Sequence, residues 1–116
     1  MKGSKIFSAM LASTLLATQG CEQHEERIFH MIRCTMAASI EKQYDSVIAK
    51  SWEMTGLYMR ENGIKKNPAE LTAIAANIRD EIMGPPDSSW DERDARVTEI
   101  VKSEFCTTYL NLLQPK

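Results

Sequence analysis

Residues 28–40 read IFHMIRCTMAASI, and this stretch decides which fold the chain can form. Its apolar side chains recur at three- and four-residue spacing, which is the pattern of a buried α-helical face. That face consists of Phe29, Ile32, Met36, Ile40, Tyr44 and Val47. Further apolar residues lie on other sides of the stretch, and a helix of this kind is usually covered by several neighbours. We therefore expect the central helix of a bundle, with Cys34 facing a partner helix.

The sequence on either side predicts where helices begin and end. We expect the first helical segment to run as one long helix or to split between Gln43 and Ser46, and to stop at Asn62-Gly63, where glycine can adopt a left-handed cap. Asn67-Pro68 with Glu70 has the composition of a capping box that begins the next helix. Gly84-Pro85-Pro86 ends that helix, because proline cannot continue its hydrogen bonding.

A last helix is expected after Asp87-Ser88-Ser89, with Ser88 or Ser89 as its cap. Its predicted apolar face is Val97, Val101, Phe105, Tyr109 and Leu112. No stretch alternates between apolar and polar residues for long enough to indicate a strand. The sequence therefore predicts an all-α protein, a small bundle of three to four helices.

The amino-terminal residues have the organisation of an export signal. Lys2 and Lys5 precede an apolar run from Ile6 to Ala17, which is shorter than the roughly 20 residues of a membrane-spanning helix. Small residues precede Cys21, where we expect cleavage. This predicts a signal peptide at 1–20 and a single helical domain at 21–116, in the periplasm.

The residues around the cleavage point resemble a bacterial lipobox, although Thr18 and Gln19 depart from its usual residues. The resemblance implies a lipid anchor on Cys21, and Glu22 after it resembles the pattern of lipoproteins sent to the outer membrane. The alternative is a secreted protein in which Cys21 is free or paired.

The odd number of cysteines favours a lipid anchor on Cys21. Three cysteines leave one unpaired in an exported chain unless it is otherwise modified. A lipidated Cys21 leaves Cys34 and Cys106 to form a disulfide in an oxidising compartment. That bond would contribute about 4 kcal/mol to the free energy of unfolding in the chain-entropy account. The alternative is two buried free thiols that act as small apolar side chains.

Charge and residue types exclude several functions. Because Lys2 and Lys5 leave with the leader, 12 basic side chains face 16 acidic ones, which argues against nucleic-acid binding. His24 and His30 have metal-like spacing to Cys21 and Cys34, but a lipidated or disulfide-bonded sulfur is no thiolate ligand. We therefore predict neither a metal nor a cofactor, and no catalytic residues.

A candidate binding surface lies before the last helix, at Asp87, Trp90, Asp91 and Arg93. Tryptophan and arginine are over-represented at binding hot spots. We favour Trp90 folding back onto the bundle; if it is exposed, this surface could bind a protein partner.

Three segments resemble the periplasmic immunity proteins of type VI secretion amidase effectors: Cys34-Thr35, Gly56-Leu57-Tyr58-Met59 and Phe105-Cys106-Thr107-Thr108-Tyr109. The resemblance implies an exported, disulfide-bonded helical protein, often a dimer, that occludes the active site of a peptidoglycan-cutting amidase. A second likeness is to secretin pilotins, small helical lipoproteins of the outer membrane. We therefore expect a non-enzymatic inhibitor of a secreted wall-degrading enzyme, or else a pilotin or assembly factor.

Overall fold

The computed structural model describes residues 23–41 and 44–114, and within them the chain is helical and has no strand. The five described helices are residues 23–40, α2 (Asp45–Glu61), α3 (Pro68–Met83), α4 (Trp90–Val101) and α5 (Glu104–Leu113). The predicted all-α class is confirmed, with five helices in place of three or four. The predicted leader and Cys21 lie outside the described residues.

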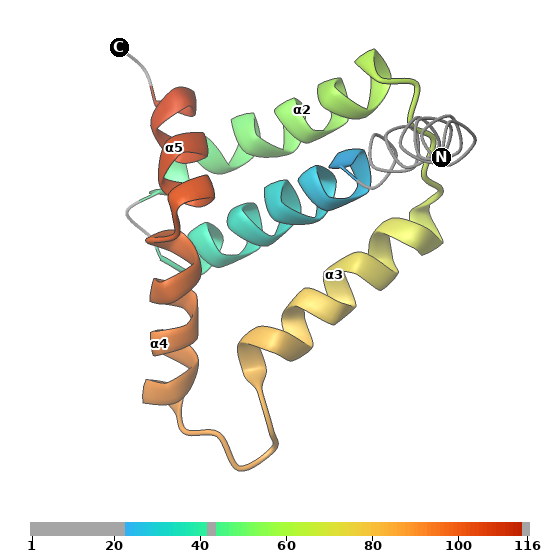
Figure 1. Cartoon of the computed structure of the whole chain (residues 1–116). Helices are drawn as coiled ribbons and strands as arrows, with labels where there is room; N and C mark the ends of the chain where they lie inside the picture. Colours follow the sequence, from blue (N-terminus) through green and yellow to red (C-terminus); the bar gives the residue numbers. More distant parts are fainter. Residues whose placement is uncertain (1–22, 42–43, 115–116) are drawn as a thin grey trace, which may run out of the picture.

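Helix 23–40 is central, as predicted. It lies between α2 and α3, while α4 and α5 continue one another in nearly one line across the end of this layer (Figure 1). Arg33 on its outer side forms a two-point ion pair with Glu81 of α3, at 2.9 and 2.5 Å. Lys66 reaches Glu25 at 2.8 Å and so ties the same helix to the loop before α3.

Most helix ends follow from local sequence. The first segment is two helices, which separate between residue 40 and Asp45, in line with the predicted split. Gly63 after α2 has φ 63°, which glycine adopts without steric cost. Asn67 and Glu70 form the predicted capping box at α3: the Asn67 side chain accepts from the Glu70 backbone N–H at 2.8 Å.

The last predicted helix is two helices, and this corrects its predicted face. Ser103 restarts the helix, because its side chain accepts a hydrogen bond from the Cys106 backbone N–H as the N-cap of α5. The break turns α5 so that Cys106, Leu110 and Leu113 are buried. Leu112, predicted to be in the core, is 78% exposed.

Ile40 is a second correction. It was predicted on the buried face, but it is 52% exposed at the last residue of the central helix, where the helical repeat of that face ends.

A disulfide joins Cys34 of the central helix to Cys106 of α5, so the predicted pair is present. Their Cα atoms lie 5.3 Å apart, and each cysteine is about 1% exposed. Around it the core contains aliphatic residues from all five described helices, including Ile28, Val47, Ile78, Val97 and Leu110. The disulfide therefore fixes α5 to the middle of the core.

Candidate functional site

The four predicted binding residues lie together at the start of α4, and we call them the Trp90 edge: Asp87, Trp90, Asp91 and Arg93. Trp90 is 71% exposed, so the favoured expectation that it folds back onto the bundle is wrong. The Arg93 guanidinium lies 4.6 Å from the centre of the Trp90 ring, in the range of a cation–π contact. Asp87 and Asp91 are exposed beside them.

Two arginines of α4 hold this edge against the end of α3. Arg93 Nε donates to the Met83 carbonyl at 3.1 Å. Arg96 donates to the carbonyls of Ile82 and Met83 at 2.8 and 3.0 Å. These carbonyls would otherwise lack helical partners, and a cation is favourable at this end of a helix. Arg93 thus positions Trp90 as well as lying beside it.

Gly84 leaves room for the Arg96 side chain at the end of α3. Its φ is 67° and its ψ is −163°, a region that is essentially restricted to glycine. A Cβ built there would lie 2.7 Å from the Arg96 guanidinium carbon and 2.8 Å from Ser88 Oγ. Glycine at this position therefore lets Arg96 reach the end of α3 and keeps the loop before Trp90 in place.

A second surface, which sequence reasoning missed, is an apolar groove between the central helix, α2 and α5. It has a volume of about 590 Å³. Its apolar lining comes from all three helices and includes Met31, Met54, Leu57, Phe105 and Leu112. Arg27, Glu61 and Glu104 are the charged residues that line it. We call this surface the α2–α5 groove.

Aromatic side chains continue from the α2–α5 groove along the central helix. Phe105 stacks on Tyr109 with ring centres 5.8 Å apart, and His30 lies 5.4 Å from Phe105. His24 Nδ1 and the Tyr58 hydroxyl form a hydrogen bond of 2.6 Å. Both histidines therefore pack against aromatic rings.

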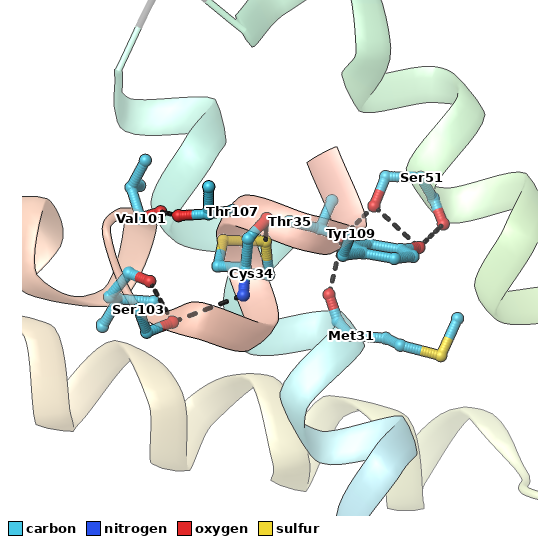
Figure 2. The surroundings of a disulfide bond; sticks show 10 residues. Met31, Cys34, Thr35, Ser51, Val101, Ser103, Thr107 and Tyr109 are labelled. Carbon is cyan, nitrogen blue, oxygen red and sulfur yellow. Dashed lines mark hydrogen bonds between the residues drawn. A yellow bond between two sulfur atoms is a disulfide. The ribbon is translucent and has the colours of Figure 1, made fainter. Parts of the chain in front are cut away.

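A buried polar network holds α2 against α5 beside the disulfide. Ser51 of α2 is fully buried, and its hydroxyl donates to the Tyr109 hydroxyl at 3.1 Å. The Tyr109 hydroxyl donates to the Ser51 carbonyl at 3.1 Å, and Thr35 of the central helix lies within hydrogen-bonding distance of the Ser51 hydroxyl. Figure 2 shows Ser51 and Tyr109 facing each other near the sulfur atoms of the disulfide. The network and the disulfide together fix the walls of the α2–α5 groove.

Three features of the described residues bear on the candidate chemistries. The Cys34 sulfur is bonded to Cys106, so it cannot act with His30 as a nucleophile pair. Across 23–41 and 44–114 no group of three His, Cys, Asp or Glu side chains is placed to hold a metal ion. Within the same ranges, no helix is long and apolar enough to cross a membrane.

Comparison with known protein families, with curated proteins and with solved structures found no match. The candidate sites therefore depend on the chain's own geometry. The Trp90 edge had a sequence signal, an aromatic residue in a polar junction. The sequence signal for the α2–α5 groove was weak. Met54 and Leu57 lie off the predicted buried face of their segment, and Leu112 was predicted to belong to the buried face of the last helix.

Proposed function

We propose that the protein is an exported helical binding protein of the cell envelope that blocks a secreted peptidoglycan-degrading enzyme by contact. The Trp90 edge is its inhibitory surface. The observation that carries this proposal is the 71% exposure of Trp90 on a surface held in place by Arg93 and Arg96. Tryptophan and arginine are both over-represented among the residues that dominate binding energy at interfaces.

The contacts that hold the Trp90 edge in place also favour binding. Association requires that loops and side chains at an interface become ordered, which costs about 0.5–1.5 kcal/mol for each flexible side chain. At the Trp90 edge, hydrogen bonds to the end of α3 and the contact between Arg93 and the indole ring provide much of that order in advance. Trp90 can therefore enter a cleft of the enzyme at a low entropic cost.

The inhibitor acts in the periplasm, with Cys21 as the site of a lipid anchor in the outer membrane. This part of the proposal depends on the leader and on the lipobox-like residues before Cys21. Cysteine usage supports it, because Cys34 and Cys106 are paired and leave Cys21 as the third cysteine.

The test is the affinity for a wall-degrading enzyme encoded beside the gene, measured by titration calorimetry. Trp90→Ala is expected to raise the Kd about thirtyfold, the size of a hot-spot loss of about 2 kcal/mol. The free energy of unfolding should change by less than about 0.5 kcal/mol, because the side chain is mostly exposed.

The matched control is Trp52→Ala, which removes the other tryptophan, 46% exposed on α2. It should leave the Kd within about twofold of the wild-type value, a change of less than about 0.5 kcal/mol. Equal affinities for wild type and Trp90→Ala would contradict the proposal. So would a large drop in the stability of Trp90→Ala, which would assign this side chain to the core.

A further inference from the structure

The α2–α5 groove is a surface separate from the Trp90 edge. Glu104 is the first groove residue in α5, and it lies 14 residues after Trp90. At the α-helical rise this corresponds to about 20 Å along α4 and α5, which continue one another in Figure 1. A ligand in the groove would therefore not contact the Trp90 edge.

Several exposed apolar side chains are gathered in the groove. Met54 is 40% exposed, Leu57 36% and Leu112 78%, and all three line the same hollow. Apolar side chains gathered on one surface commonly mark an interaction site. Met54 has a flexible, exposed side chain, which can adapt to different partner surfaces.

The dimensions of the groove suit a helix. On α2 the lining runs from Met54 to Glu61, about 10 Å at the α-helical rise. α5 crosses α2 steeply in Figure 1, so a bound helix would follow the α2 wall and meet α5 at its side. An amphipathic helix that presents residues i, i+4 and i+7 spans the same length. The hydrogen bonds between Ser51 and Tyr109 keep these walls in place before binding.

The charge of the groove indicates the chemistry of the partner. Glu61 and Glu104 stand on opposite walls, and neither forms an ion pair with another described residue. The third charged residue, Arg27, has its guanidinium 5.9 Å from the centre of the Tyr58 ring. Arg27 also has no ion pair with a described residue, so the two carboxylates exceed the cations of the lining by one. This net negative charge complements lysine or arginine.

We propose that the α2–α5 groove binds an amphipathic α-helix of a partner protein, with an apolar face that covers Met54, Leu57 and Leu112. Basic side chains on the flanks of that helix pair with Glu61 and Glu104. This site is additional to the inhibitory Trp90 edge and does not depend on it.

The probes are two synthetic helical peptides of about 18 residues, because shorter isolated helices are marginal in water. Both carry the same leucine face; one has lysine and the other glutamate at the flanking positions. Binding is followed by fluorescence anisotropy of the labelled peptide at about 0.15 M salt, where charges far from the groove are screened. The lysine peptide is expected to bind about tenfold or more tightly than the glutamate peptide.

Variants locate the binding. Leu112→Asp should lower the affinity for the lysine peptide about tenfold or more. Because Leu112 is highly exposed, this substitution should leave the fold intact. The double variant Glu61→Gln with Glu104→Gln should lower the affinity for the lysine peptide about fivefold. The charge-matched control is Asp94→Asn with Glu99→Gln, two exposed positions on α4 outside the groove, which should leave the affinity unchanged. Trp90→Ala should also leave it unchanged, which separates this site from the inhibitory one.

Several results would overturn the proposal. One is equal binding of the two peptides, and another is no binding of either. If the α4 control pair lowered the affinity for the lysine peptide as much as the groove pair does, the binding would depend on the net charge of the protein and not on the groove. A dimer seen by sedimentation that Leu112→Asp dissociates would mean that a second copy of the chain, and not a foreign helix, covers the groove.

Discussion

Removal of the disulfide should cost the protein much of its stability. The perturbation is the double variant Cys34→Ala with Cys106→Ala, which leaves every other contact of the wild-type chain available. The two cysteines are 72 residues apart, and the chain-entropy relation gives about 4 kcal/mol for a loop of that length. Both are about 1% exposed, so loss of the two sulfur atoms from a close-packed core should add roughly 1 kcal/mol or more. The expected total is about 5 kcal/mol, comparable to the whole stability of many small domains.

The assay is urea unfolding followed by far-UV circular dichroism, with the wild type oxidised, the wild type reduced and the double variant compared. The unfolding midpoint of the variant should fall close to zero denaturant, and that of the reduced wild type should fall with it. Because the disulfide joins the central helix to α5, the first protection lost in hydrogen exchange should be that of α5. A loss of less than about 2 kcal/mol would refute the reasoning, since it would mean that the unfolded chain gains little freedom when the loop opens.

Three further changes test other parts of the account. Tyr109→Phe removes both hydrogen bonds to the buried Ser51 and should lower the free energy of unfolding by about 1–2 kcal/mol in urea titration; an unchanged midpoint would show that water replaces the hydroxyl. Gly84→Ala places a Cβ against the Arg96 guanidinium in a backbone region restricted to glycine, so thermal unfolding should reveal a loss of about 2 kcal/mol, and none if the loop relaxes freely. Cys21→Ala should move the protein from the membrane fraction to the soluble periplasm on cell fractionation; wild type and variant both in the soluble fraction would refute the anchor.

Local chemistry explains why most of the fold could be predicted. Asn67 and Glu70 satisfy backbone groups at one helix end, and Gly63 and Gly84 adopt positive φ at two others. Such signals involve neighbours in sequence, so one sequence suffices to find them. The cysteine pairing was also accessible, because three cysteines and a leader leave one preferred pair.

The break between α4 and α5 could not be predicted from periodicity. Val97, Val101, Phe105 and Tyr109 keep a four-residue spacing across it, so the pattern looks like that of one helix. The N-cap Ser103 ends that continuity, yet a lone serine within an apolar repeat is a weak signal.

The α2–α5 groove could not be predicted for a different reason. It depends on how α2 and α5 stand against the central helix, and no local pattern encodes that angle. Leu112 shows the consequence: its spacing is that of a core residue, but the rotation of α5 exposes it at the groove. The residues of the Trp90 edge are neighbours in sequence, so their grouping could be predicted, whereas the exposure of Trp90 could not: Arg93 and Arg96 reach across to α3 there.

The most direct test of the proposed function is the rate of peptidoglycan hydrolysis by a secreted wall-degrading enzyme, with any such enzyme encoded near this gene tested first, titrated with the oxidised protein. The rate should fall to near zero at one equivalent of wild type, whereas Trp90→Ala at the same concentration should leave most of it. Undiminished hydrolysis in the presence of excess folded, disulfide-bonded wild type would contradict the proposal that this protein inhibits such an enzyme by contact.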